Sequence, residues 1–190
     1  MRYATFLILL LCTSCIQLGG TPGIQNYYLL EPRTSTPVVG ETEFNLELQQ
    51  VKLPAYLDQP NIVTHDQANI IKFSDRERWA GPLVDNISLV IRADLALSFP
   101  NARISISPWE IAGPEPYRLN IVIERFSGQP GRMATLVADW SIIDSSHTEI
   151  ASGHFNNQLP VGDSYRDLVQ GLNQNLHLLD ERIAEDLAKR

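Results

Sequence analysis

Residues 117–126 read YRLNIVIERF, and apolar side chains alternate with polar ones along most of this stretch. Alternation with a period of two is typical of a β-strand that buries one face. Two similar runs, at residues 132–144 and 149–159, follow after short turns that are rich in Gly, Pro and Ser. Three strands of about equal length joined by short turns predict an antiparallel meander.

A strongly amphipathic helix is expected after the meander. The run Gly162-Asp163-Ser164 predicts its N-terminal cap, because Ser and Asp accept hydrogen bonds from free backbone N–H groups. Beyond the cap, apolar residues recur at steps of three and four: Leu168, Leu172, Leu176, Leu179, Ile183 and Leu187. This stripe is expected to cover one face of the sheet. His177 and the acidic pairs Asp180-Glu181 and Glu185-Asp186 are expected on the solvent side.

The part of the chain before the meander predicts short strands and a second long helix. The strands are expected at residues 26–31, 43–53, 62–65, 69–73 and 103–107. In the second of these runs the apolar phase shifts near Gln49-Gln50, which indicates a β-bulge. Ser74 and Glu77 have the spacing of a capping box, so the helix is predicted to begin there and to end before Phe99. Pro82 falls near its start, where proline is better tolerated.

These elements predict the fold class. We expect an α/β (α+β-like) fold in a single domain, with a mixed and largely antiparallel sheet and two long amphipathic helices packed on it. A chain of 190 residues is long enough to bury one substantial core without a disulfide or a metal ion.

Charge and cysteine content exclude several classes of function. The chain has 22 acidic and 15 basic residues, a net charge of −7, and no basic cluster, which argues against nucleic-acid binding. Its two cysteines, Cys12 and Cys15, both lie near the N-terminus. A disulfide scaffold, a zinc ribbon, an iron–sulfur site and a cysteine nucleophile are therefore not expected in the body of the protein.

The N-terminus predicts export and lipidation. Arg2 is followed by a short, mainly apolar run at residues 4–11, too short to span a bilayer, as in a secretory signal peptide. Thr13 and Ser14 directly before Cys15 resemble a bacterial lipobox. We therefore expect a signal peptide at 1–14, a lipidated Cys15 with a flexible tether at 15–26, and a domain at 27–190. Modification of Cys12 and an ordinary signal peptide are the alternatives. Ile16 takes the place of an inner-membrane retention signal, so the periplasmic face of the outer membrane is expected.

Catalytic motifs are missing from the sequence. Neither a phosphate-binding loop, a nucleophile elbow, a dinucleotide fingerprint nor a zinc-protease motif occurs, so we expect no enzyme and no cofactor. The best metal candidate is Asp144, His147 and Glu149 at a hairpin tip. Polar residues are common at such tips, and a solvated turn is the simpler interpretation.

Aromatic residues are more informative. Tyr27 and Tyr28 are adjacent, so in a strand one faces the core and the other faces away. Trp79, near the start of the predicted helix, and Trp109, in a proline-flanked loop, lie outside the predicted strands. Large aromatic residues in such places are enriched at protein interfaces.

The sequence also resembles a known family. The resemblance covers essentially the whole chain after the lipobox and is carried by three runs: Tyr27-Tyr28-Leu29-Leu30, Leu53–Val63 (LPAYLDQPNIV) and Arg78–Leu83 (RWAGPL). They resemble the ABC-type transport auxiliary lipoprotein family, of which the paraquat-inducible lipoproteins are the best-known members. Gln59, His65 and Gly81 stand where that pattern leads one to expect Arg, Arg and Glu.

The resemblance implies a non-enzymatic subunit that is anchored in the outer membrane and docks an MCE-type intermembrane lipid transport system. Its partners would be an MCE-domain protein and the associated inner-membrane components, with self-association left open. The alternative is a periplasmic lipid carrier or chaperone. Candidate partner-binding residues are Tyr56, Leu57, Asp58, Trp79 and Trp109. In a purely structural interpretation, Pro54 and Pro60 fix the turn and Asp58 caps it.

Overall fold

The structure, a computed structural model, describes residues 24–35, 38–65 and 70–189. The predicted signal peptide and Cys15 lie outside the described residues. Within them no helix is both long enough and apolar enough to cross a membrane.

The predicted meander is present and forms one side of the sheet. It consists of β6 (Tyr117–Gly128), β7 (Met133–Ile143) and β8 (Glu149–Pro160), which pair antiparallel in sequence order. Leu119, Ile121 and Ile123 of β6 are buried, as the alternation predicts.

Five shorter strands extend the sheet from the other edge of β6. They are β1 (Asn26–Tyr28), β2 (Asn45–Leu48), β3 (Asn61–His65), β4 (Ile71–Trp79) and β5 (Arg103–Ile106). β2 and β3 both pair parallel with β6, at its start and at its end. β5 pairs with β2 in parallel. β4 lies between β3 and β1 and pairs antiparallel with β3 and parallel with β1. The described chain thus forms one mixed eight-stranded sheet, whose longest pairings are antiparallel.

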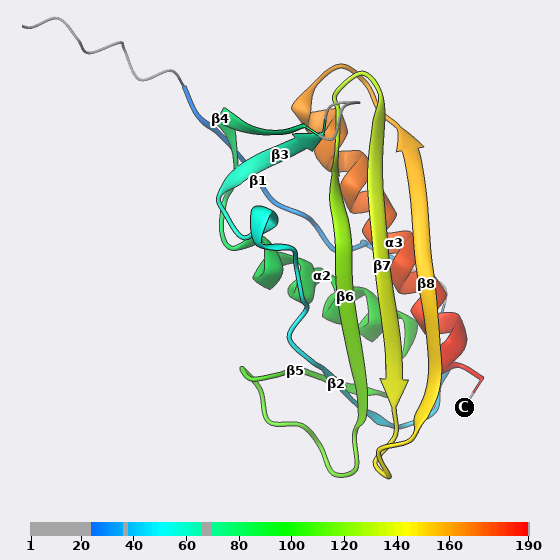
Figure 1. The fold of residues 1–190 in the computed structure, drawn as a ribbon. Helices are drawn as coiled ribbons and strands as arrows, with labels where there is room; N and C mark the ends of the chain where they lie inside the picture. The colour runs from blue at the N-terminus through cyan, green and yellow to red at the C-terminus, as the bar shows by residue number, and fades with distance from the viewer. Residues whose placement is uncertain (1–23, 36–37, 66–69, 190) are drawn as a thin grey trace, which may run out of the picture.

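Two helices cover the same face of this sheet (Figure 1). α2 (Leu83–Ser98) contacts β5, and α3 (Tyr165–Leu187) lies along β7 and β8 and also contacts α2. All six residues of the predicted stripe on α3 are buried. Ser164 caps α3 and forms a reciprocal capping box with Asp167. The predicted α+β architecture is therefore confirmed.

The helix predicted from Ser74 is wrong over its first turns. Residues 71–79 form β4, and α2 begins only at Leu83, directly after Pro82. The local capping contact nevertheless exists, because Ser74 Oγ accepts a hydrogen bond of 3.1 Å from the backbone N–H of Glu77. This contact lies in a bulge of β4. In the pairing with β3, the residues between Phe73 and Arg78 lie opposite a single residue, Ile62.

The phase shift near Gln49-Gln50 is confirmed. Leu46, Leu48 and Val51 are all buried, so the buried positions change phase after β2. The backbone N–H of Gln49 donates to Leu119 O at 2.9 Å, and the chain remains beside β6 beyond that point.

Candidate docking surface

Three segments that are separate in the sequence meet at one corner of the molecule. β1 pairs with the end of β4, so that Tyr28 lies opposite Trp79. The N–H of Trp79 donates to Pro60 O at 2.7 Å, and the N–H of Ala80 donates to Tyr28 O at 2.9 Å. β1, the turn before β3 and the end of β4 therefore form one hydrogen-bonded unit. We call it the docking corner.

The docking corner carries an open hollow of about 410 Å³. Its walls are Asp58–Pro60 on one side and Trp79–Leu83 on the other. A Cβ added to Gly81 would meet no atom within 4 Å, so this position opens directly into solvent. The hollow is bounded by residues from two of the runs that carry the family resemblance, 53–63 and 78–83.

The turn before β3 contains a short 3₁₀ helix, η1 (Ala55–Leu57). The N–H of Asp58 donates to Ala55 O at 3.2 Å, and the side-chain amide of Gln59 donates to Tyr56 O at 2.6 Å. Gln59, rather than the Asp58 carboxylate, thus supplies the side-chain bond that closes the turn. Leu57 is buried and Asp58 is exposed.

Tyr56 is half-buried on the outer side of this turn. Its hydroxyl donates to Glu124 O at 3.3 Å, and its ring meets the ring of His65 edge-on at 5.9 Å between centroids. Burial raises the pKa of Tyr56, and the nearby Arg125 guanidinium partly offsets this effect. The side chain therefore rests against the sheet with one edge open to solvent.

The two tryptophans singled out from the sequence lie in different environments. Trp79 is the last residue of β4, is only 5% exposed, and packs at 6.3 Å from the ring of Phe126. The expectation that it lies at a helix start, outside the regular core, is wrong. Trp109 is 50% exposed in the segment between β5 and β6. That segment lies at the lower end of the view in Figure 1, away from the docking corner.

Tyr27 and Tyr28 point to opposite sides, as expected for adjacent strand residues. Tyr27 is 60% exposed, whereas Tyr28 packs against the core. The Tyr28 hydroxyl donates to Glu77 at 2.7 Å. Burial, followed by this contact with Glu77, raises the pKa of Tyr28 to about 12. Tyr27 and the exposed Leu29 thus add apolar surface to the docking corner.

Comparison with known families decides where the chain belongs. A family model described as the ABC-type transport auxiliary lipoprotein component matches residues 27–184. The chain belongs to this family. The resemblance inferred from the three sequence runs is thereby confirmed. The auxiliary lipoprotein matches no curated protein.

Solved structures share the fold of this auxiliary lipoprotein. One, described as an uncharacterized protein, has a TM-score of 0.74 at 19% identity and covers 86% of this chain and 99% of its own. Another, a Xanthomonas campestris protein of family DUF330, has a TM-score of 0.71 at 17% identity, with coverages of 84% and 93%.

Two asparagines hold the segment after β1 against both helices of the auxiliary lipoprotein. Asn86 of α2 accepts from the N–H of Leu30 at 2.7 Å and donates to its carbonyl at 3.0 Å. Asn173 of α3 makes the same pair of bonds with Glu31, at 3.1 and 3.0 Å. Each side-chain amide thus replaces the strand partner that the backbone lacks there. We call these two contacts the asparagine clamps.

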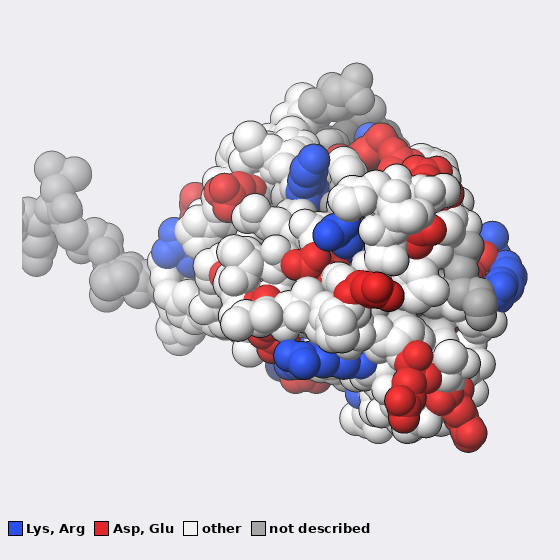
Figure 2. Space-filling model, turned by 90° about the horizontal axis from the view of Figure 1, so that it is seen from below, with Lys and Arg blue, Asp and Glu red and all other residues white. Residues whose placement is uncertain are grey.

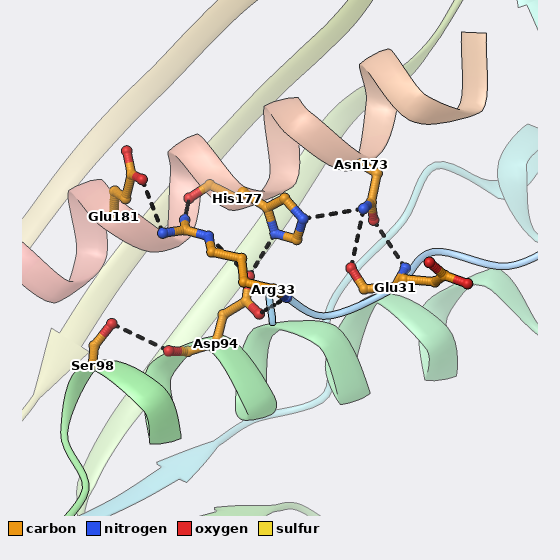
Figure 3. A network of polar contacts seen from close by, with 7 residues as sticks. All are labelled: Glu31, Arg33, Asp94, Ser98, Asn173, His177 and Glu181. Carbon is orange, nitrogen blue, oxygen red and sulfur yellow. Dashed lines mark hydrogen bonds and ion pairs between the residues drawn. The ribbon is translucent and has the colours of Figure 1, made fainter. Parts of the chain in front are cut away.

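A polar network between α2 and α3 continues from the clamps (Figure 3). The N–H of Arg33 donates to Asp94 Oδ1 at 2.8 Å, and its Nε lies 3.4 Å from Asp94 Oδ2. The guanidinium also donates to the carbonyl of His177 and to Glu181. His177 Nδ1 lies 2.5 Å from Asp94 Oδ2. The buried carboxylate of Asp94 therefore joins the N-terminal segment to both helices.

The hydrogen bonds fix the tautomer of His177. Because Asn173 accepts from the N–H of Glu31 and donates to its carbonyl, its amide orientation is set. The amide nitrogen therefore faces His177 Nε2 at 3.1 Å and donates to it. Nδ1 then carries the imidazole proton and donates to Asp94.

Asp180 lies beside this network and is only 2% exposed. Neither of its carboxylate oxygens accepts a hydrogen bond from the residues that the structure describes. Burial, followed by the neighbouring Asp94 charge, raises the pKa of Asp180 well above its ordinary value. The expectation that His177 and Asp180 lie on a solvated helix face is wrong, because α2 and the residues after β1 cover that face.

Two groups of side chains have metal-ligand chemistry. The first group is Asp94, His177 and Asp180, whose potential ligand atoms lie within 4.8 Å of one another. Asp94 is already bound by the Nδ1 proton of His177 and by the Arg33 guanidinium. The sequence candidate at Asp144 forms a closed turn, in which its carboxylate accepts from Ser146 Oγ at 2.7 Å and from the Thr148 N–H at 2.9 Å. These bonds, that from Ser146 first, lower the pKa of Asp144. Hydrogen bonds and ion pairs account for Asp94 and His177, and hydrogen bonds account for the turn at Asp144.

Proposed function

We propose that this protein is a non-enzymatic docking subunit of an MCE-type intermembrane lipid transport system that maintains the cell envelope. In this proposal, lipidated Cys15 anchors it to the periplasmic face of the outer membrane, and the folded domain binds an MCE-domain protein. The family supplies the auxiliary transport role. The lipobox-like run before Cys15 supports the anchor.

The observation that carries the docking role is the convergence of three motifs on one corner. Exposed Asp58, Tyr27 and the free edge of Tyr56 form its outer surface. Leu57 and Trp79 lie beneath and hold that surface in shape. Trp109 lies elsewhere and would belong to a second contact. A preformed surface of this kind needs little ordering on binding, which favours association.

The alternative role as a lipid carrier has less support. The hollow between Phe44, Phe99 and Tyr117 is lined by aromatic rings, as a lipid site would be, but measures about 110 Å³. Ligand pockets generally occupy about 300 Å³ or more. The larger hollow of the docking corner is open at the surface, so the docking role is the better explanation.

Site-specific photocrosslinking in intact cells tests the docking role. A photoreactive phenylalanine analogue placed at Asp58 is expected to yield an adduct that contains an MCE-domain protein, identified by mass spectrometry. The same analogue at Asn156, an exposed position on β8, serves as the matched control. The docking proposal fails if the analogue at Asp58 yields no such adduct, or if the analogue at Asn156 yields it equally.

A further inference from the structure

A bulge in β6 turns two polar side chains to the outer face of the sheet. Ile123 pairs with Ala138, but the next paired residue, Arg125, lies opposite Val137, so Glu124 is extra. Because one extra residue reverses the alternation, Phe126 takes up the core-facing role after Ile123. Arg125 and Ser127 therefore face away from the helices.

These side chains line a hollow of about 330 Å³ at the end of β3 and β6. Its lining residues are His65, Arg125, Ser127, Gly128, Gln129, Arg132, Met133 and Thr135. None of them is acidic, although acidic residues outnumber basic ones by 22 to 15 in the chain. Among the described lining residues, the formally charged side chains are those of Arg125 and Arg132.

The floor of the hollow is made of buried hydroxyl groups. Ser127 and Thr135 are only 1% and 7% exposed and lie opposite each other on β6 and β7. Ser127 Oγ lies 2.8 Å from His65 Nδ1. Burial, followed by the Arg125 charge, lowers the pKa of His65 and so favours its neutral ring. The positive charge in the hollow therefore belongs to the arginines.

Acidic and basic side chains are interspersed over the opposite end of the molecule, which Figure 2 views from below. The hollow lies instead toward the end at which β6 turns into β7, which is also the end from which the chain enters β1 (Figure 1).

We propose that this hollow binds the phosphate group of an anionic ligand. A guanidinium presents paired N–H donors that match phosphate oxygens, and the hydroxyl groups of the floor supply further donors. A cleft lined by charge of one sign concentrates the field on a bound ion of the opposite sign. Its volume fits a head group or a small phosphate ester rather than a polymer. The site requires the charge of Arg125.

The phosphate can come from a lipid head group or from a soluble compound, and binding measurements distinguish these sources. The full-length lipoprotein in neutral detergent is titrated calorimetrically with short-chain phosphatidylglycerol and, separately, with inorganic phosphate, at constant ionic strength. Binding of the lipid alone assigns a head-group site. Binding of both with similar affinity assigns a site for phosphate itself. The proposal is abandoned if neither binds.

Two variants test the assignment to residues. Arg125→Gln should weaken binding about tenfold or more, because it removes a charged hydrogen-bond donor. Arg182→Gln is the matched control, since Arg182 lies exposed near the end of α3 beside Glu185 and carries the same charge. It should leave affinity within about twofold. Equal losses in both variants would show non-specific attraction and overturn the proposal. Because Arg125 is exposed, its variant should retain the thermal melt of the parent protein.

The phosphate site stands apart from the docking role. If Arg125→Gln loses anion binding while the Asp58 photoadduct persists, the two sites act separately. If the photoadduct fails while anion binding persists, only the docking proposal is lost.

Discussion

His177 of α3 donates a hydrogen bond of 2.5 Å to Asp94 of α2, and this bond links the two helices. Asp94 also receives the backbone and guanidinium groups of Arg33. One carboxylate therefore holds three segments of the chain together. The same two residue types form an exposed pair elsewhere, His154 with Asp139 at 2.8 Å.

The buried and exposed pairs predict different mutational effects. Asp94→Ala should lower the free energy of unfolding by about 3–5 kcal/mol, because it leaves Arg33 and His177 without their shared acceptor. Asp139→Ala should change it by no more than about 0.5 kcal/mol, because exposed pairs contribute little. Urea denaturation of both variants measures this. Equal effects would show that the Asp94 network is not a stabilising element.

Asp180 predicts an effect of pH on stability. Its pKa in the folded protein is raised above the ordinary value of 3.8. Above that pH the unfolded chain loses the proton while the folded protein retains it, so the stability associated with Asp180 is complete below pH 3.8 and is lost as the pH rises toward the raised pKa. Asp180→Asn should therefore gain stability relative to the parent protein as the pH increases from 4 toward neutrality.

The measurement for Asp180 is the urea midpoint of both proteins at several pH values. Glu185→Gln, on the exposed side of the same helix, is the control and should follow the parent protein throughout. Parallel curves for Asp180→Asn and the parent would contradict the raised pKa.

The stripe of α3 predicts a loss of folding. Leu176→Asp places a carboxylate at a position that is completely buried, where an unpaired charge is very unfavourable. We expect this variant to lack a cooperative thermal transition. Gln174→Asp, two residues away on the exposed side, should melt like the parent protein. Coincident melts of all three would mean that the stripe is not buried.

Substitutions of Tyr56 test both stability and partner binding. Tyr56→Phe removes only the hydroxyl bond to Glu124 O and should lower stability by about 1 kcal/mol or less. Tyr56→Ala also removes the ring against His65, so both stability and co-purification with the MCE-domain protein should fall. If co-purification is unchanged in the Ala variant, Tyr56 is not a partner contact, and the Tyr27 surface becomes the better candidate.

Cys15 predicts membrane attachment. Cys15→Ser should lose labelling by a palmitate probe and leave the outer-membrane fraction, because several acyl chains on one residue are needed for stable anchoring. Cys12→Ser serves as the control and should retain both properties. Labelling that persists in Cys15→Ser would contradict the lipobox assignment.

The sequence predicts a helix or strand best where that element packs one face against one neighbouring layer and leaves the other in solvent. The alternation in residues 117–126 and the apolar stripe from Leu168 to Leu187 both have this property, and both elements form as expected. At Ser74 the local signal is real but insufficient. The cap-like hydrogen bond to Glu77 forms. The surrounding backbone nevertheless pairs with β1 and β3, so tertiary contacts make this segment a strand rather than a helix.

The polar contacts of the structure were harder to predict. His177 and Asp180 lie off the apolar stripe, and a helix packed only against a sheet would leave them in solvent. They are buried because α2 and the segment around Arg33 cover a second side of α3. Sequence separations of 83 residues for Asp94 and His177, and of 62 for His65 and Ser127, leave no local pattern that marks these pairs.

The asparagine clamps have a mechanical consequence. If Cys15 is held in a membrane, any pull on the domain enters through β1, which is only three residues long. Shortly after β1, the backbone N–H and C=O of Leu30 both hydrogen-bond to Asn86 of α2, and those of Glu31 to Asn173 of α3. Tension that frees β1 would therefore meet four hydrogen bonds that must yield nearly together. The force is then transmitted to both helices and the core, so the domain resists unfolding from its N-terminal end when force is applied through the anchor.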